Sequence, residues 1–312
     1  MGLKIASRVF LPLSLFFFGW VKDERLPAMM ESISVESLRR HVLNLHFARS
    51  PCDQDHSLER AAQYIFNELQ QGGMDVHRDP FYWEGKRFDN IVAEKKGTSC
   101  PDRIILLGAH YDTVPGSPGA DDNASAIAVL LEVAKHLKNT HLRSTLRLIA
   151  FSLEECGYIG STHYAQKTKR ESETLVGMIS LEMVGFTGPR QNYPPYIDRK
   201  HYPPVGDFIA VVGNRRSEVL LENVRQAVTF HVPRLPAEFL MVPQNGEGME
   251  EVRLSDHSPF WDLGYPALMM TDTAFLRNPN YHLPTDTIDT LDFEFMQKVA
   301  VGIVHAMVEL AK

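Results

Sequence analysis

The sequence predicts an α/β domain built on a central mixed, mostly parallel sheet with helices on both faces. Apolar runs rich in β-branched residues alternate with stretches of helical periodicity, which is the pattern of such sheets. Of the 312 residues, 44% are hydrophobic and 23% are charged, which is enough apolar material for one large core. The expected strands are residues 88–93, 104–110, 146–151, 176–181, 208–213 and 266–271.

Helical spacing of apolar residues predicts helices around these strands, at residues 34–46, 58–69, 124–137, 160–169, 217–230 and 293–310. One segment, residues 185–207, shows neither period and contains five prolines and three tyrosines. A long irregular stretch inside a compact domain is typical of a functional loop. We therefore expect the 185–207 segment to form a lid or a specificity wall, with a plain surface insertion as the alternative.

The first 30 residues differ from the rest of the chain. Lys4 and Arg8 precede an apolar run over residues 9–20, which is short for a membrane span but suits a secretory signal. We expect residues 1–30 to be a signal or membrane-anchor segment and residues 31–312 to be one globular domain. The protein is then exported, to the periplasm or the exterior, or associated with a membrane through this segment. Cleavage stays open, because no clear small-x-small site follows the run.

Charge and cysteine content exclude some kinds of partner and site. With 32 Lys+Arg against 39 Asp+Glu the net charge is −7, and the basic residues are scattered, which argues against nucleic acid as a partner. Cys52, Cys100 and Cys156 are widely spaced and odd in number, so they form neither a disulfide framework nor a thiolate metal site. Any metal must be held by histidines and carboxylates.

A histidine and an aspartate stand where a buried strand is expected to end. His110 closes the 104–110 run, and ligands bind at the carboxyl ends of strands in open α/β sheets. A metal-binding histidine normally donates its second ring proton to a carboxylate, so Asp112 is either that partner or a brace for its neighbours. A packed histidine beside a turn explains the His-x-Asp pattern equally well when it is taken alone.

Two pairs of carboxylates follow. Asp121 and Asp122 precede the 124–137 helix; they suit helix caps, but a carboxylate in this place can also bridge two divalent cations. Glu154 and Glu155 follow the 146–151 strand. Adjacent carboxylates repel each other unless a cation lies between them and gives each a different role. One of them would then bind metal while the other takes a proton from water. A solvated acidic turn is the alternative for the glutamate pair.

Two further residues complete the set. Glu182 ends an apolar run, where a charge is costly unless it is paired or bound to metal. His282 lies in the loop after the last expected strand. Two imidazoles and three carboxylates form a mixture that suits zinc at neutral pH.

From about residue 32 to its end the chain resembles the zinc exopeptidase family M28, which includes aminopeptidases, glutamate carboxypeptidase-like enzymes and the related glutaminyl cyclases. Five blocks carry the resemblance in the family's order: GAHYD from Gly108, GADDNAS from Gly119, the pair Glu154–Glu155, SLEM from Ser180 and YHLPTDT from Tyr281. The resemblance implies the zinc-exopeptidase (phosphorylase/hydrolase-like) fold for residues 31–312, as a catalytic domain.

The resemblance also implies two zinc ions. One would be held by His110 and Glu182 and the other by Glu155 and His282, with Asp122 bridging them. The family often has aspartate where this chain has Glu182, a longer carboxylate that can still bind the ion.

The same resemblance implies catalytic roles and a backbone feature. Glu154 is expected to be the general base that removes a proton from the attacking water, with Asp112 beside it in the catalytic set. The family also tends to hold a cis peptide after its bridging aspartate. We therefore expect a cis bond between Asp122 and Asn123.

Four more residues are candidates for supporting or substrate-side positions. Asp256 and His257 stand in a block, LSDHSPFW, that also resembles the family; a helix cap and a packed imidazole are the alternatives. Arg277 would either grip a substrate carboxylate or pair with a nearby acid and hold its loop. Asp286 belongs to the same group, because it lies in the block of His282.

The function expected from the resemblance is an aminopeptidase acting on a peptide or a small aminoacyl substrate. A carboxypeptidase of the same family and a glutaminyl cyclase-like acyltransferase with one zinc are the alternatives. A non-catalytic, receptor-like relative is less expected, because none of the six expected positions is lost. Side-chain specificity and oligomeric state are not predicted.

Overall fold

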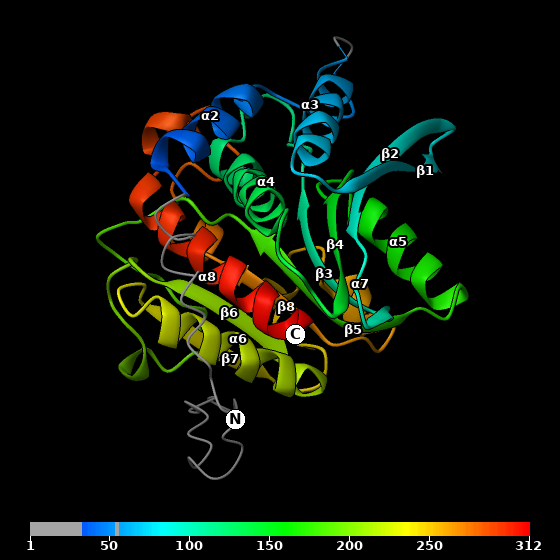
Figure 1. Ribbon diagram of the computed structural model, residues 1–312. Coiled ribbons are helices and arrows are strands. Elements are labelled where there is room, and N and C mark those ends of the chain that lie inside the picture. The colour runs from blue at the N-terminus through cyan, green and yellow to red at the C-terminus, as the bar shows by residue number, and fades with distance from the viewer. Residues whose placement is uncertain (1–32, 54–55) are drawn as a thin grey trace.

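The computed structural model describes residues 33–53 and 56–312 of the chain. Its centre is one eight-stranded sheet in the order β1-β2-β4-β3-β5-β8-β6-β7 (Figure 1). The strands are β1 (Asp75–Trp83), β2 (Lys86–Lys95), β3 (Cys100–His110), β4 (Ser144–Phe151), β5 (Thr174–Glu182), β6 (Ile209–Asn214), β7 (Ala237–Val242) and β8 (Ala267–Thr271). The α-helices are α2 (Val35–Leu45), α3 (Ser57–Gln71), α4 (Ala126–Leu137), α5 (Ile159–Arg170), α6 (Glu218–His231), α7 (Ser258–Asp262) and α8 (Phe293–Ala311).

The middle of the sheet is parallel. Strands β4, β3, β5 and β8 run in one direction, and β6 and β7 are parallel to each other. Antiparallel pairs join β1 to β2, β2 to β4 and β6 to β8. The prediction of a mixed, mostly parallel sheet is confirmed, and the carboxyl ends of the four central strands meet at one edge.

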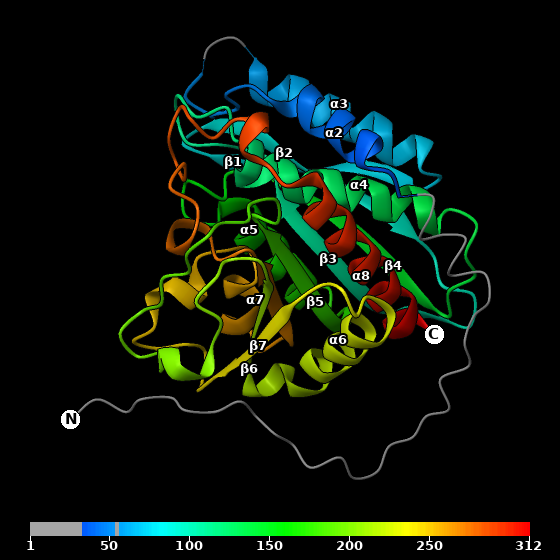
Figure 2. The ribbon, with the colours of Figure 1, turned by 90° about the vertical axis from the view of Figure 1, so that its left-hand side faces the viewer.

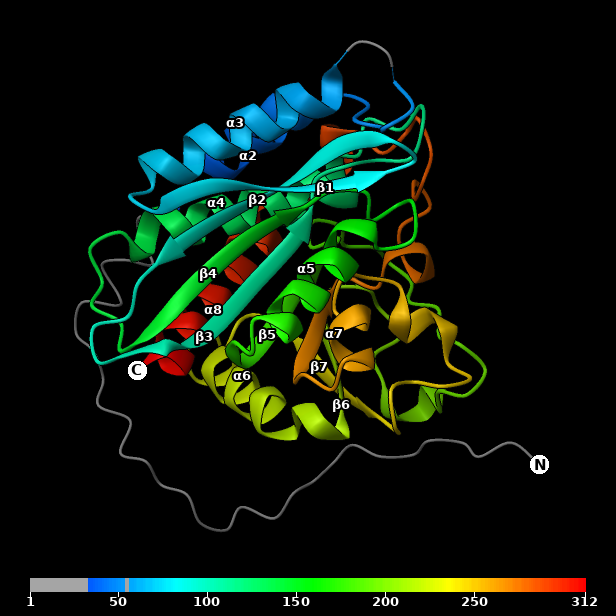
Figure 3. The same cartoon turned by 90° about the vertical axis from the view of Figure 1, so that its right-hand side faces the viewer.

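Helices cover both faces of this sheet (Figures 2 and 3). Helices α4, α6 and α8 pack on one face, where α3 lies beside α4 against β1 and β2 and α2 packs outside α4 and α8; α5 and α7 pack on the other face. Each central strand therefore alternates between two cores: in β3, Ile105 and Leu107 point to the first and Ile104 and Leu106 to the second. Such burial on both faces is why these strands read as continuous apolar runs.

Every expected helix and strand is present within a few residues of its predicted bounds. Two edge strands, β1 and β7, were not predicted. Strand β1 is largely exposed and contains Pro80, which only an edge strand tolerates, and five of the six residues of β7 are half-buried without alternation. The 185–207 segment is irregular as expected; it holds a single 3₁₀ turn, Arg199–His201, and one bridge between Gly188 and Gly206.

The expected signal or anchor at residues 1–30 lies outside the described residues. Among the residues that the structure does describe, no helix has the length and apolar character needed to cross a membrane.

Candidate metal centre

Strand ends place the predicted side chains at one edge of the sheet. His110 is the last residue of β3 and Glu182 the last of β5. Glu154 and Glu155 follow the end of β4, where Phe151 is paired with His110. Because β4, β3 and β5 are parallel neighbours, these side chains converge, and Asp122 and His282 join them from the loops that follow β3 and β8.

Asp122 lies at the centre of the cluster. Its Oδ1 is 3.3 Å from Nε2 of His110, and its Oδ2 is 3.2 Å from Nε2 of His282. Each imidazole nitrogen faces a second carboxylate: Nε2 of His110 is 3.5 Å from Oε1 of Glu182, and Nε2 of His282 is 3.1 Å from Oε2 of Glu155. The cluster thus has two halves, each with one imidazole and one glutamate, that share the two oxygens of a single aspartate.

Glu154 adjoins the half that contains His110. Potential ligand atoms of His110, Glu154 and Glu182 all lie within 4.8 Å of one another. Glu154 is buried, and burial, together with the charges of Glu182 and Asp256, raises the pKa of its carboxyl well above the usual value, although His110 opposes this. A carboxyl whose pKa is raised in this way is suited to accept a proton near neutral pH.

The carboxylates outnumber the imidazoles, and the electrostatics reflect that excess. Burial alone would lower the pKa of His110, but Glu182 and Glu154 outweigh it and raise that pKa well above the usual value. Burial would raise the pKa of Asp122, but hydrogen bonds from His110 and His282 hold it well below its normal range. A buried site with this balance favours added positive charge.

The donor set fits zinc. Nitrogen and carboxylate oxygen are the ligands zinc takes in proteins when thiolates are absent. Two buried oxygens at the cluster, Oε1 of Glu155 and Oε2 of Glu182, accept no hydrogen bond from the described residues. Buried carboxylate oxygens without partners are costly, so they are suited to hold a cation.

Asp112 braces both sides of the cluster. Its Oδ1 and Oδ2 accept the backbone N–H groups of Glu154 at 3.0 Å and of Glu155 at 3.1 Å. Nδ1 of His110 lies 3.3 Å from the Asp112 carbonyl oxygen and 3.7 Å from its carboxylate. The buried Asp112 carboxylate therefore orients the glutamate pair, as the bracing alternative expected, whereas Nδ1 of His110 is hydrogen-bonded to the Asp112 carbonyl oxygen rather than to its carboxylate.

The backbone at the central aspartate is held from two directions. The peptide bond between Asp122 and Asn123 is cis, which confirms the prediction. Asp286 accepts the N–H groups of Asp121 and Asp122 at 2.9 and 3.1 Å. Asn123 donates to the carbonyl of Leu181 at 3.0 Å and so ties this loop to β5.

Three residues that adjoin or belong to the cluster have left-handed backbone conformations. Leu153 precedes Glu154 with φ 61°, Met183 follows Glu182 with φ 47°, and His282 itself has φ 60°. Non-glycine residues adopt this region at a cost of about 1 kcal/mol or more, and such residues gather at functional sites.

The other candidates have different surroundings. Asp256 is buried, and burial raises the pKa of its carboxyl to about 7. The charges of His110, which lowers this pKa, and of Glu182, which raises it, also act on Asp256. His257 has the environment of a packed imidazole, because its ring lies edge-on to Trp261 at 4.4 Å and its Nε2 is 2.9 Å from the Val252 carbonyl oxygen. Arg277 holds its loop, through Gln191 and a backbone carbonyl rather than through an acid.

Two supporting features escaped the sequence analysis. Arg49 is buried and donates to five carbonyl oxygens, those of Leu45, Phe47, Tyr111, Pro118 and Gly119. Asp121 and Asp272 form a second buried carboxyl pair behind Asp122; burial, and then the charge of Asp272, raises the pKa of Asp121 well above normal. The two consecutive aspartates could have indicated a supporting role for Asp121, whereas no neighbouring sequence pattern indicates one for Arg49 or Asp272.

Comparisons with known proteins show which family and fold the chain is similar to. The family model described as peptidase family M28 matches residues 90–307. The uncharacterized Escherichia coli protein YfbL is 34% identical over 94% of this chain and 93% of its own. The structure of BSAP, described as a zinc aminopeptidase from Bacillus subtilis, is 26% identical with a TM-score of 0.58, over 74% of this chain and 52% of that one. A glutaminyl cyclase of Macrostomum lignano shares the fold, with a TM-score of 0.72 and 16% identity over 93% of each chain.

Proposed function

The chain belongs to peptidase family M28, and we propose that this zinc metallopeptidase is an aminopeptidase that holds two zinc ions. His110 and Glu182 would hold one ion and Glu155 and His282 the other, with Asp122 between them. The observation that carries the proposal is the pair of imidazole nitrogens at 3.3 and 3.2 Å from the two oxygens of Asp122. A carboxylate approached in this way on both oxygens has the arrangement of a bridge between two cations.

Zinc, when bound, supplies a Lewis acid that polarises the scissile carbonyl and lowers the pKa of water. Glu154 accepts the proton of the attacking water, for which its buried carboxyl beside Glu182 is suited, and later gives it to the leaving amine. Asp112 keeps the Glu154 and Glu155 backbone in place during these transfers. Asp286 does the same for the loop of Asp122.

Cleavage at the amino end is supported by the charges beside the cluster. The cavity that adjoins Glu182 has three charged residues among the described residues that line it, and all are glutamates: Glu182, Glu238 and Glu251. Acidic groups suit an α-ammonium, whereas a terminal carboxylate needs a cation. Arg277, the cation considered for that role, is 6% exposed and engaged with Gln191 and Phe186. The similarity to BSAP, which is named a zinc aminopeptidase, also supports cleavage at the amino end of the peptide.

A pair of substrates tests which end is cut. Leucine-p-nitroanilide offers a free α-ammonium, and an N-blocked dipeptide offers only a free carboxylate. We expect the zinc-loaded protein to hydrolyse the first and not the second. Turnover of the blocked dipeptide alone would instead identify a carboxypeptidase.

The number of zinc ions per chain distinguishes the aminopeptidase from the glutaminyl cyclase-like acyltransferase. We expect two zinc ions per chain after loading and removal of excess metal, measured by elemental analysis, and loss of activity on dialysis against a chelator. One ion per chain, together with cyclisation of an N-terminal glutamine in a peptide, would favour the glutaminyl cyclase-like acyltransferase.

Export is the last part of the proposal. It rests on residues 1–30, where Lys4 and Arg8 precede the apolar run of residues 9–20. Fractionation of cells that express the full chain with a C-terminal tag should recover the protein outside the cytosol or on the membrane. Recovery from the cytosol alone would contradict it.

A further inference from the structure

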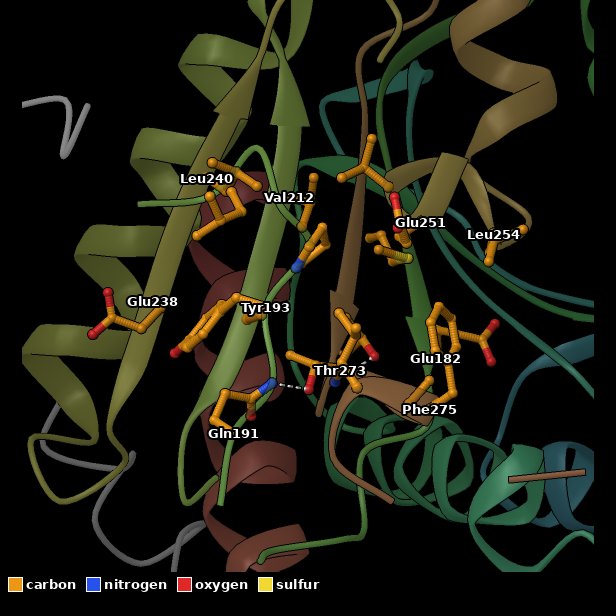
Figure 4. Close-up of a pocket in the computed structure, with 18 of the residues that line it drawn as sticks. Glu182, Gln191, Tyr193, Val212, Glu238, Leu240, Glu251, Leu254, Thr273 and Phe275 are labelled. Atoms are coloured by element: carbon orange, nitrogen blue, oxygen red, sulfur yellow. Dashed lines mark hydrogen bonds between the residues drawn. The ribbon is translucent and has the colours of Figure 1, made fainter. Parts of the chain in front are cut away.

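Two cavities meet at Leu254. The first is the cavity that adjoins Glu182, and Figure 4 shows Leu254 and Glu182 at one of its ends and Glu238 at the other. The second is an open groove between α5 and α7, which are neighbours in Figure 3; it contains about 1020 Å³ of empty space, counting its mouth. Because the exposed side chain of Leu254 lines both, the groove adjoins the first cavity.

The groove begins beside the general base. Tyr158 lines it, comes one helical turn after Glu154 and donates its backbone N–H to the Glu154 carbonyl at 2.8 Å. Burial, and after it the charge of Glu154, raises the pKa of the Tyr158 hydroxyl. In the proposed mechanism Glu154 gives its proton to the leaving amine, so the leaving part of the substrate starts here. The amino end lies on the side of Glu182, and the leaving part is therefore directed towards the groove.

One face of α5 gives the groove its length. Tyr158, Thr162 and Gln166 are four residues apart and line the groove as a row. Eight residues of helix rise by about 12 Å. An extended chain covers about 3.3 Å per residue, so the row matches roughly three to four residues of a peptide.

The opposite wall comes from α7 and from the turn before it. Arg253 ties these two parts together, because it donates to the Asp262 carboxylate at 2.8 and 3.0 Å and to the Asn245 carbonyl at 2.8 Å. The Ser258 hydroxyl donates to the Arg253 carbonyl. The wall is therefore braced by contacts of its own and does not depend on a ligand for its shape.

Most of the side chains that line the groove are polar. Those of Tyr158, Thr162 and Gln166 form no hydrogen bond with any other residue that the structure describes. An extended peptide has a donor and an acceptor on nearly every residue, and it needs such partners. Glu250 also lines the groove and has no ion pair within residues 33–53 and 56–312, so its carboxylate favours a cation.

We propose that this groove binds the leaving part of a peptide substrate as an extended chain of roughly three to four residues, with a preference for a basic side chain beside Glu250. This inference rests on the proposed aminopeptidase function. Contacts along the groove assist cleavage, because binding energy from remote parts of a substrate is used at the reacting bond. The protein therefore acts on oligopeptides better than on dipeptides.

A series of peptides of increasing length tests the groove. For the zinc-loaded full chain we expect kcat/KM to rise roughly tenfold from leucyl-alanine to leucine followed by four alanines, and to stay level in longer peptides. The rise reflects contacts along α5, and the plateau reflects the end of the row at Gln166. Equal kcat/KM at every length would overturn the assignment of the groove.

Thr162→Trp fills the middle of the row. We expect it to lower the pentapeptide-to-dipeptide ratio of kcat/KM by roughly fivefold or more, because the chain then clashes beyond Tyr158. Thr229→Trp is the matched control, since Thr229 is an exposed threonine of α6, on the other face of the sheet. Zinc content and a thermal melt show that each variant is folded. A wild-type ratio in folded Thr162→Trp would refute the groove.

A second variant serves if Thr162→Trp does not fold. Gln166 is exposed, so Gln166→Trp leaves the core unchanged and blocks only the far end of the row. We expect kcat/KM to fall for the pentapeptide, while that for leucine followed by two alanines stays at its wild-type value. An unchanged pentapeptide-to-dipeptide ratio in Gln166→Trp would count equally against the groove.

The charge preference is tested with pentapeptides that carry one lysine or one glutamate at the third, fourth or fifth position in turn. At one of these positions we expect the lysine peptide to be cleaved roughly threefold better, which is the size of an exposed ion pair. Glu250→Gln should remove this preference. Glu247→Gln, at an exposed acid of the same loop that does not line the groove, should keep it. A wild-type preference in Glu250→Gln would contradict the role of Glu250.

Failure of the groove and failure of the aminopeptidase function give different results. If the wild-type chain hydrolyses neither leucine-p-nitroanilide nor any of these peptides, the aminopeptidase function itself fails. If it hydrolyses the anilide and peptides of every length with similar kcat/KM, only the groove does.

Discussion

Asp286 accepts a 3.1 Å hydrogen bond from the backbone N–H of Asp122, although 164 residues separate the two in sequence. Its other carboxylate oxygen accepts the N–H of Asp121 at 2.9 Å. Asp286 thus fixes the backbone that presents the central carboxylate of the proposed zinc site, and it comes from the same loop as His282. Loss of this carboxylate would disturb both halves of the cluster together.

Asp286→Ala should therefore weaken zinc binding without removing a ligand. Partners that orient metal ligands typically contribute 10- to 100-fold to affinity, and we expect a loss in that range. Competition with a chromophoric chelator would measure it. Asp286→Asn keeps one acceptor oxygen and should fall between wild type and alanine. Wild-type affinity in Asp286→Ala would contradict the bracing role.

Glu154→Gln should separate proton transfer from metal binding. The amide keeps the size of the side chain but cannot accept a proton, so kcat for leucine-p-nitroanilide should fall by about two to four orders of magnitude, while zinc content stays at its wild-type value. Glu171→Gln, at an exposed acid beyond the end of α5, is the matched control. Full activity in Glu154→Gln would exclude it as the base.

The central strands and the motif blocks of this chain could be predicted because each is marked by a pattern within a few consecutive residues. Strands β3, β4, β5 and β8 are apolar runs buried on both faces, and each catalytic candidate follows such a run directly. Strand β1 was missed because its sequence is rich in polar residues, and β7, although largely apolar, was missed because it is short and half-buried without alternation. Their identity is decided by the neighbouring strand rather than by their own pattern.

The supporting residues were missed for a related reason. Arg49 finds two of its acceptors, Pro118 and Gly119, 69 and 70 residues away, and Asp272 reaches Phe186 across 86 residues. From sequence alone, an isolated arginine or aspartate in a loop is predicted to be exposed to solvent, because the distant residues that bury it are not known. For Arg277 the two alternatives differed only in the partner, which the 185–207 segment supplies and no spacing rule predicts.

Arg49→Met should lower stability strongly. Five backbone carbonyl oxygens lose the Arg49 donor; those of Leu45 and Gly119 keep a backbone N–H, and the other three are left unsatisfied. An unsatisfied buried acceptor costs about 1–3 kcal/mol, so we expect a loss of about 3 kcal/mol or more in the free energy of unfolding. Urea denaturation measures this loss. Arg60→Met is the control: exposed Arg60 lies 3.8 Å from the ring centre of Phe47, and its loss should cost less than about 1 kcal/mol. Equal effects would contradict the carbonyl-binding role.

Stability should also fall with acid through a histidine pair far from the metal centre. The rings of His231 on α6 and His305 on α8 stack at 3.9 Å. Burial, and then the charges of His231 and Lys312, lowers the pKa of His305 to about 4, and burial lowers the pKa of His231 as well. Because the unfolded chain binds these protons near pH 6.5 and the folded chain does not, the pair's contribution is complete above pH 6.5 and is lost progressively as pH falls towards 4.

His305→Phe keeps an aromatic ring against His231 but removes one titrating group. Its urea midpoint should therefore fall less between pH 7 and pH 5 than that of the wild type, while His77→Gln, at an exposed histidine of β1, should keep the wild-type dependence. Measurements on zinc-free protein remove the contribution of metal release at low pH. If wild type and His305→Phe lose stability in parallel over this range, the acid sensitivity resides in other groups and the stacked pair is a packing contact alone.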